Sequence, residues 1–307
     1  MTTIDNIELD ENNVEFNYAS EFVKHTDKLV YLTGKAGTGK TTFLKSLKSN
    51  TSKNTVILAP TGVAAINAGG QTIHSFFHLP FGPFVVNDKR LRTSKDLGDL
   101  DNTTIYSTFK YRDDKKIIIE QLELLIIDEI SMVRCDTLDV IDKILRVFRK
   151  KPFLPFGGVQ VILIGDTFQL PPIADFAQWE ILKDYYDSPF FFSSKIVAEN
   201  KPIYIELKKI YRQKEQEFID LLNKIRVNQI NETELNELNK KYNPTFSANG
   251  IDNHIILSTT NAQVNQTNAT KLDELKSETT IFEGEITGTF PKDSKGNFVL
   301  PTEQNLH

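Results

Sequence analysis

The chain has 307 residues with a formal net charge of −5, and 39% of them are hydrophobic and 25% charged. The composition is typical of a globular protein, and the length indicates roughly two domains. No apolar stretch is long enough to span a membrane, and the polar start MTTIDNIELDENN is unlike a signal peptide. Cys135 is the only cysteine, which excludes internal disulfides and a cysteine-based zinc site. The negative net charge is not typical of a nucleic-acid-binding protein, but it does not exclude a local groove that binds a nucleic-acid strand.

Apolar runs and amphipathic segments alternate along the chain. The runs are continuously apolar, as in parallel strands that are covered on both faces. They lie at Leu29–Leu32, Thr55–Ala59, Leu124–Ile127, Val159–Ile164 and His254–Leu257. Apolar residues recur at helical spacing between Asp136 and Arg149, and again from about Glu215 to Arg226. This alternation predicts an α/β fold built on a doubly wound parallel sheet.

The rhythm breaks between residues 80 and 120, where the sequence is polar and charged and contains Gly82, Pro83 and Gly98. We therefore expect an inserted subdomain at 80–120. A first domain would then comprise residues 1–79 and 121–199.

A second domain is expected to start at about residue 200 and to run to about residue 280. Residues 281–307 place glycines and prolines among short apolar pieces, which predicts the start of a small β-rich insertion. That pattern stops abruptly at His307, so we expect the sequence to be a truncated part of a longer protein.

A glycine-rich segment follows the first apolar run. Residues 34–41, GKAGTGKT, fit the phosphate-binding pattern G-x-x-x-x-G-K-[ST], with an expected strand before them and a helix-forming segment after them. Glycines let the backbone curl so that consecutive N–H groups face phosphates, and the following helix N-terminus adds partial positive charge. Lys40 is placed to reach the terminal phosphates, and the Thr41 hydroxyl is placed to ligate magnesium. A glycine-rich turn before an ordinary helix would not explain all of the defining positions together.

We therefore expect this segment to bind a nucleoside triphosphate together with Mg²⁺, and ATP is the default nucleotide. The expected nucleotide-binding residues are Gly34, Lys35, Ala36, Gly37, Thr38, Gly39, Lys40, Thr41 and Thr42.

Two acids, Asp128 and Glu129, follow the apolar run Leu124–Ile127. A parallel strand places both at the carboxyl edge of the sheet, beside the phosphate loop. Asp128 would hold the magnesium ion, and Glu129 would orient or deprotonate the attacking water. Many strands end in solvated acids, so the pair gains meaning only from the phosphate loop upstream.

Taken in order, these segments resemble the motifs of superfamily-one helicases of the RecD-like branch, which move 5′ to 3′. The matching segments are GKAGTGKTT (34–42), APTGVAA (59–65), TIHSFF (72–77), IIDEISMV (126–133), GDTFQLPPI (165–173) and YRQ (211–213). The segment KKPFLPFGGVQ (150–160) is similar to the signature of the Pif-one helicase family. The resemblance covers about residues 13–270. It implies a RecA-like phosphate-loop fold, with a wedge subdomain at the insertion and a partial second RecA-like domain.

The resemblance also implies roles for single residues. Gln169 would sense the γ-phosphate, and Arg212 would contact it from the second domain as an arginine finger. Together with Lys40 and Glu129, these residues form the expected catalytic set. The expected DNA contacts are Thr61, Gly62, Val63, His74, Ser75, Thr260 and Asn261.

Several of these residues have an ordinary alternative explanation. Thr61 and Gly62 fit a plain helix cap, and His74 fits a buried histidine whose hydrogen bonds are satisfied. Three phenylalanines are more simply explained by core packing, although an exposed ring could stack on a base: Phe76, Phe77 and Phe81.

Two features depart from the family pattern. Related helicases often carry a glutamine that reads adenine upstream of the phosphate loop, but residues 13–19, NVEFNYA, contain none. Phe16 in this stretch would pack near the base or simply anchor the first helix. The late DNA-coupling motif and a second arginine finger would lie beyond His307, so we expect this chain to bind nucleotide and DNA but to unwind poorly.

The resulting prediction is an ATP-dependent 5′-to-3′ DNA helicase that acts as a monomer on single-stranded and forked duplex DNA. Its roles would lie in DNA repair, recombination, replication or telomere maintenance. It would act in the cytoplasm of a bacterium, or in the nucleus or mitochondrion of a eukaryote. Two alternatives stay open, a phosphate-loop ATPase of another class and a nucleotide- and DNA-binding module without catalysis.

Overall fold

A computed structural model describes residues 13–93, 103–211, 215–246 and 255–275. The chain divides into two compact units, Met1–Ile230 and Asn231–His307. No helix among the described residues is long and apolar enough to cross a lipid bilayer.

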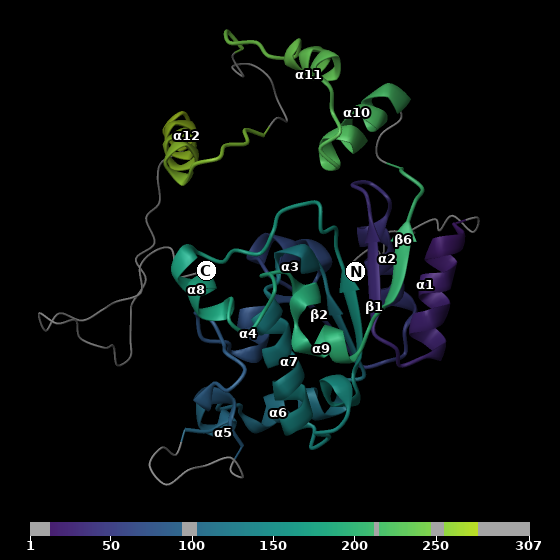
Figure 1. Cartoon of the computed structure of the whole chain (residues 1–307), viewed down its shortest axis with the longest axis vertical. Coiled ribbons are helices and arrows are strands. Elements are labelled where there is room, and N and C mark those ends of the chain that lie inside the picture. Colours follow the sequence, from purple (N-terminus) through teal and green to yellow (C-terminus); the bar gives the residue numbers. More distant parts are fainter. Residues whose placement is uncertain (1–12, 94–102, 212–214, 247–254, 276–307) are drawn as a thin grey trace, which may run out of the picture. The chain divides into compact units, whose positions relative to one another are not determined.

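The first unit is built on a six-stranded sheet with the order β3-β2-β4-β5-β1-β6 (Figure 1). The strands are β1 (Val30–Gly34), β2 (Thr55–Ala59), β3 (Gln71–Thr72), β4 (Leu124–Ile127), β5 (Gln160–Ile164) and β6 (Ile203–Leu207). All neighbouring strands pair in parallel. The predicted α/β fold with a parallel sheet is therefore confirmed.

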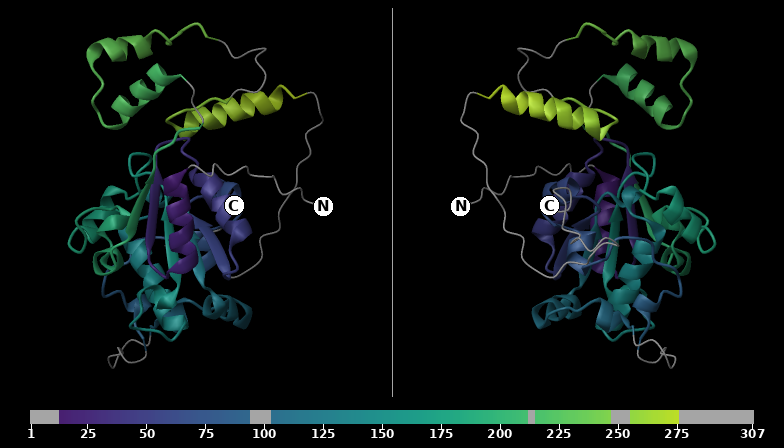
Figure 2. Two further views of the ribbon diagram at one scale, coloured as in Figure 1. Left: turned by 90° about the vertical axis from the view of Figure 1, so that its right-hand side faces the viewer. Right: turned by 90° about the vertical axis from the view of Figure 1, so that its left-hand side faces the viewer.

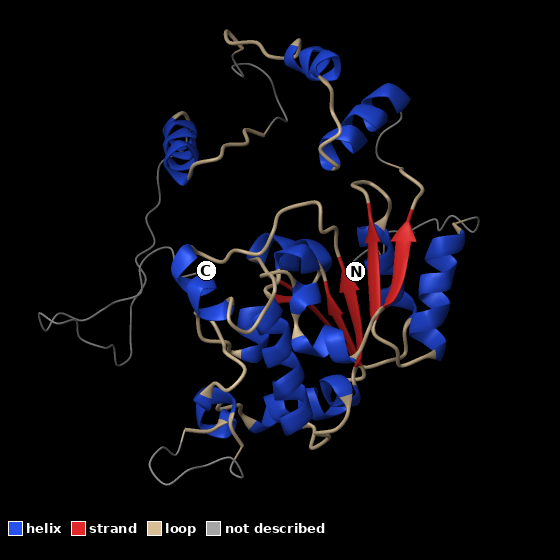
Figure 3. Cartoon of the chain, in the orientation of Figure 1, coloured by secondary structure: helices blue, strands red, loops and turns tan. Residues whose placement is uncertain are grey.

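Helices cover both faces of this sheet. In Figure 3 the red strands lie between two groups of blue helices. Apolar side chains of α1 (Val14–His25), α2 (Lys40–Asn50) and α3 (Gly62–Ala68) pack with strand residues such as Leu32 on one face. The turned views of Figure 2 show α1 lying along the sheet.

The other face holds the larger part of the core. The helices that cover it are α4 (Ile73–Phe77), α6 (Asp113–Gln121), α7 (Cys135–Phe148) and α9 (Lys195–Glu199). Helix α7 confirms the helix expected at Asp136–Arg149, because Leu138, Ile141 and Leu145 on its spaced apolar face are fully buried.

The segment 80–120, expected as an insertion, contains α5 (Ile105–Thr108) and α6. Its apolar residues Phe84, Ile105 and Phe109 belong to the same core cluster as α7. The described part of this segment therefore packs onto the first domain and has no separate core of its own.

Strands β3 and β6 were not predicted. In β6 the polar or exposed residues Tyr204 and Glu206 alternate with the buried Ile205 and Leu207, because this strand lies at the edge of the sheet. Such alternation lacks the continuous apolar run that marks the central strands. Because β6 pairs with β1, the expected domain boundary near residue 200 was wrong, and the division falls after Ile230.

Helix α8 (Phe176–Leu182) follows β5, and α10 (Gln216–Arg226) closes the first unit and confirms the second expected helix. The second unit contains α11 (Glu232–Asn239) and α12 (Asn261–Asp273).

The strand expected at His254–Leu257 is not found at its described positions, since Ile255 and Leu257 are irregular and more than four-fifths exposed. An apolar run becomes a strand only where it has a partner strand, and the described residues of this unit include none. A second RecA-like domain remains a prediction.

Candidate active site

The glycine-rich segment forms the loop between β1 and α2. Gly34, Gly37 and Gly39 adopt φ angles of 154°, 79° and 93°, a region that favours glycine. The Lys40 ammonium lies inside the loop and donates hydrogen bonds to the carbonyl oxygens of Gly34 (2.7 Å) and Lys35 (3.1 Å). This is the geometry of a phosphate cradle, with the cation at its centre and the N-terminus of α2 at its rim.

The remaining loop residues fall into two groups. Thr38 is buried, and its hydroxyl donates to the carbonyl of Lys35, so it braces the loop from within. Ala36 and Thr41 are exposed, and Thr42 is half-buried in the first turn of α2. The Thr41 hydroxyl is therefore accessible to a ligand.

Asp128 and Glu129 leave the end of β4 at the carboxyl edge of the sheet, as expected. Glu129 adopts the left-handed conformation at φ 51°, which is uncommon for a residue other than glycine. Its N–H donates to the Asp128 carboxylate at 3.0 Å. Strained backbone of this kind persists where the surrounding structure holds a functional side chain in a required direction.

The electrostatics show that these groups share one site. Burial lowers the pKa of Lys40, and the negative charges of Asp166, Glu129 and Asp128 oppose that shift. Burial also raises the pKa of Asp128 to about 6; the hydrogen bond from the Glu129 N–H and the charge of Lys40 oppose this rise, and the Glu129 carboxylate adds to it. A buried carboxylate that is hard to ionise gains most from a cation beside it.

The side chains fit a magnesium ion. Asp128 and Thr41 offer hard oxygen donors, the type that this ion prefers. No cluster of three or more His, Cys, Asp or Glu ligands occurs in the described part of the chain. Magnesium commonly takes one or two protein ligands and completes its shell with substrate phosphates and water, so the oxygen donors of Asp128 and Thr41 are compatible with this ion.

Gln169 lies on the turn that follows β5, and its side-chain amide donates to the buried carboxylate of Asp166 at 3.1 Å. The same carboxylate accepts a hydrogen bond of 2.8 Å from Arg226 at the end of α10. Sequence patterns missed Arg226, because a basic residue in the last turn of a helix is ordinary and carries no motif.

Arg212, the expected arginine finger, lies outside the described residues. The residue before it reaches the site, since the Tyr211 N–H donates to the carbonyl of Gly37 at 2.8 Å. The Tyr211 hydroxyl accepts from Asn13 at 3.0 Å. Phe16 packs edge-on against Phe43 of α2 with a centroid distance of 5.1 Å, so it anchors the first helix.

The DNA contacts expected on the first unit follow β2 and β3, at the same sheet edge as the phosphate loop. Thr61 caps α3 through its side chain, and Gly62 and Val63 are exposed in the first turn. Ser75 is exposed, but its N–H donates to the Thr72 hydroxyl. The cap explanation for Thr61 therefore holds, and it leaves the exposed groups beside it accessible.

The three phenylalanines near His74 separate into two classes. Phe76 and Phe77 are buried, as the core explanation expected, but Phe81 is 86% exposed. The Phe81 ring stacks on the half-buried His74 with a centroid distance of 5.5 Å and an interplanar angle of 21°. Core packing is therefore wrong for Phe81, which offers an open aromatic face.

Thr260 and Asn261 lie in the second unit, where Thr260 is the N-cap residue of α12 and Asn261 begins the helix. Both side chains are exposed.

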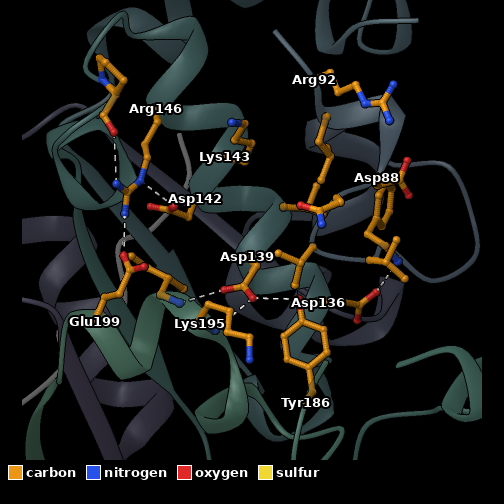
Figure 4. A pocket seen from close by; sticks show the side chains of 18 residues that line it. Asp88, Arg92, Asp136, Asp139, Asp142, Lys143, Arg146, Tyr186, Lys195 and Glu199 are labelled. Atoms are coloured by element: carbon orange, nitrogen blue, oxygen red, sulfur yellow. Dashed lines mark hydrogen bonds and ion pairs between the residues drawn. The ribbon is translucent and has the colours of Figure 1, made fainter. Parts of the chain in front are cut away.

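A separate cavity of about 930 Å³ lies between α7, α9 and the segment 84–92 (Figure 4). Its carboxylates are held by protein groups, as when Asp139 accepts from Tyr186 and from the backbone of Ile196. None of the phosphate-loop residues line it. The cavity is therefore distinct from the phosphate site.

Comparison with known proteins agrees with this geometry. A family model described as PIF1-like helicase matches residues 10–236. The chain belongs to the PIF1-like helicase family.

Within this family, the ATP-dependent DNA helicase PIF1 of Saccharomyces cerevisiae (strain YJM789) is 34% identical over 295 residues, covering 90% of this chain and 30% of the yeast protein. The human protein of the same name is 32% identical over 260 residues, which cover 83% of this chain and 36% of the human protein. This PIF1-like chain thus spans about a third of the length of these curated relatives.

Solved PIF1 structures share the RecA-like phosphate-loop fold. The Pif1 helicase from Bacteroides in complex with ADP-AlF3 and ssDNA is 42% identical with a TM-score of 0.74, covering 86% of this chain and 58% of that one. A structure of DNA unwinding at forked dsDNA by two coordinating Pif1 helicases shows 39% identity and a TM-score of 0.75. The match covers 94% of this chain and 63% of that one.

Proposed function

We propose that this chain is the nucleotide-binding part of an ATP-dependent DNA helicase that translocates on single-stranded DNA. The observation that carries the proposal is the position of Lys40, which lies within the phosphate loop and within the electrostatic field of Asp128, Glu129 and Asp166. A cation in a glycine cradle opposite a pair of acids is suited to the cleavage of a terminal phosphate.

In the proposed reaction, the loop N–H groups and Lys40 bind the phosphates of ATP. Asp128 and Thr41 would hold Mg²⁺, which would supply positive charge to offset the negative charge that develops on the phosphates. Glu129 orients the attacking water and accepts its proton, while Gln169 and Arg212 contact the γ-phosphate.

The DNA strand is proposed to cross the exposed groups that follow β2 and β3, namely Thr61, Gly62, Val63, His74 and Ser75. Thr260 and Asn261 would contact it from the second unit. Contacts of this kind reach phosphates and bind without reading sequence, so binding should be tolerant of sequence and sensitive to salt.

The 5′-to-3′ direction, the role of segment 80–120 as a wedge and the action as a monomer on forked DNA belong to the same proposal. Membership of the PIF1-like helicase family supports action on DNA. A related structure with two coordinating Pif1 helicases at forked dsDNA leaves action as a monomer a prediction, like the direction and the wedge. Because the proposed substrate is DNA, the proposed compartment is the cytoplasm in a bacterium and the nucleus or mitochondrion in a eukaryote.

The proposal is tested by measuring ATP hydrolysis by the chain with and without single-stranded DNA. We expect stimulation by single-stranded polymers of any sequence, and loss of the stimulated rate in Glu129→Gln. Hydrolysis that no polymer stimulates would contradict translocation on DNA. A wild-type rate equal to that of Glu129→Gln would instead identify a binding module without catalysis.

A further inference from the structure

Asp166, two residues after the end of β5, is the centre of a compact network. Its side chain is 3% exposed, and its two oxygens accept from the Phe168 N–H (3.1 Å), the Gln169 amide (3.1 Å) and Arg226 (2.8 Å). The carboxylate therefore fixes both the backbone of the turn and the side chain of Gln169. Buried charges are stable only when they are paired in this way.

Arg226 reaches this turn from α10, sixty residues further along the chain. Its guanidinium also lies 4.5 Å from the centre of the Phe168 ring, and its side chain is 17% exposed. Arg226 thus contacts the turn through both an ion pair and a cation–π interaction. This combination of contacts favours arginine over lysine, whose ammonium lacks the planar fork.

The network borders the phosphate loop. A cavity of about 300 Å³ is lined by Lys35 of that loop, by Phe168 and by residues of α10 that include Asn223 and Arg226. Asp166 and Arg226 also act in opposite directions on the pKa of Lys40. An Asp166 carboxylate without its partner would place uncompensated negative charge next to the site for an anionic nucleotide.

We propose that Arg226 is a positioning residue for the γ-phosphate: by pairing with Asp166 it fixes the turn that carries Gln169 and neutralises the carboxylate beside Lys40. This inference rests on the proposed function and adds α10 to the nucleotide site. Arg226 acts through Asp166 and Gln169, so its effect should depend on the third phosphate. A purely structural anchor for α10 would affect all nucleotides alike.

The test compares dissociation constants for Mg²⁺ with ADP and with a non-hydrolysable ATP analogue, measured by calorimetry on the whole chain. We expect Arg226→Gln to weaken binding of the analogue about tenfold and binding of ADP by less than about twofold, as loss of one compensating charge near the γ-phosphate implies. Arg226→Lys should recover part of the analogue affinity, because it keeps the charge but lacks the planar fork of arginine. Asp166→Asn combined with Arg226→Gln should recover part of it, because both charges are removed.

The matched control is Arg146→Gln. Arg146 donates to Asp142 at 2.6 Å, is 18% exposed and lies at the separate cavity of Figure 4. It should lower the melting temperature but leave both dissociation constants unchanged. Equal weakening of ADP and analogue in Arg226→Gln, or no weakening of either, would overturn the proposal. A wild-type chain that binds neither nucleotide would contradict the proposed function itself, and this inference with it.

Discussion

Gly34, the first residue of the phosphate loop, packs directly against the backbone of Leu207 in the edge strand β6. A β-carbon at Gly34 would lie 2.7 Å from the Leu207 carbonyl oxygen and 2.5 Å from the Thr38 hydroxyl. This close approach places the first residue of the phosphate loop in contact with strand β6. The loop therefore depends on a strand that lies more than 160 residues further along the chain.

Gly34→Ala should destabilise the first unit by about 1–3 kcal/mol, since the added methyl overpacks a closed contact. Nucleotide binding should weaken as well, because the loop must shift to relieve the clash. Thermal melting and calorimetry measure the two effects. Gly62→Ala is the matched control, because a β-carbon at Gly62 meets no atom within 4 Å. Equal melting temperatures for the two variants would show that the Gly34 contact is unimportant.

Glu129→Gln should reduce DNA-stimulated ATP hydrolysis by about 10²–10⁴-fold, the usual contribution of a positioned general base. The amide keeps the size of the side chain but cannot accept the proton of water, so affinity for Mg²⁺ with ATP should be retained. Steady-state phosphate release and calorimetry on the same variant separate the two properties. Parallel loss of binding and turnover would assign Glu129 to nucleotide binding instead.

Phe81→Ala should weaken binding to a single-stranded oligonucleotide by about 1–3 kcal/mol if the open ring stacks on a base. The melting temperature should hardly change, because Phe81 is 86% exposed. Fluorescence anisotropy with a labelled oligonucleotide measures the affinity. Phe153→Ala, the control, removes another exposed ring, which is 92% accessible. The stacking hypothesis fails when both variants bind DNA like the wild type.

Arg134→Gln should lower the free energy of unfolding by about 3–5 kcal/mol, because it leaves the buried Asp136 without its charged partner. Arg134 donates to both oxygens of Asp136, which is fully buried, and to the carbonyl of Gly82. Denaturant unfolding measures the change. Arg112→Gln, which breaks an exposed pair with Asp114, should cost under about 1 kcal/mol. Similar costs for the two variants would contradict the importance of burial.

The sequence predicted the central strands and the phosphate loop because their signals are local. Continuous apolar runs marked β2 and β4, and the spacing of glycines with Lys40 identified the cradle without knowledge of its neighbours. The paired acids could be placed at the carboxyl edge because every parallel strand ends there.

Other features depend on contacts between distant segments and left no local signal. The strand β6 was missed because its edge position gives it an alternating pattern, and this moved the expected domain boundary. Arg226 looks like any helix-terminal arginine until the fold brings it to Asp166. Phe81 carries the same side chain as Phe76 and Phe77, and only the folded chain shows which ring is exposed.

The most direct measurement is calorimetric titration of the chain with Mg²⁺ and a non-hydrolysable ATP analogue, in parallel with Lys40→Ala. Lys40 closes the cradle through its hydrogen bond to Gly34, so we expect saturable heat from the wild type and none above dilution from the variant. Circular dichroism should show that both chains are folded. Identical titration curves for the two folded proteins would contradict a triphosphate site at this loop and the motor function built on it.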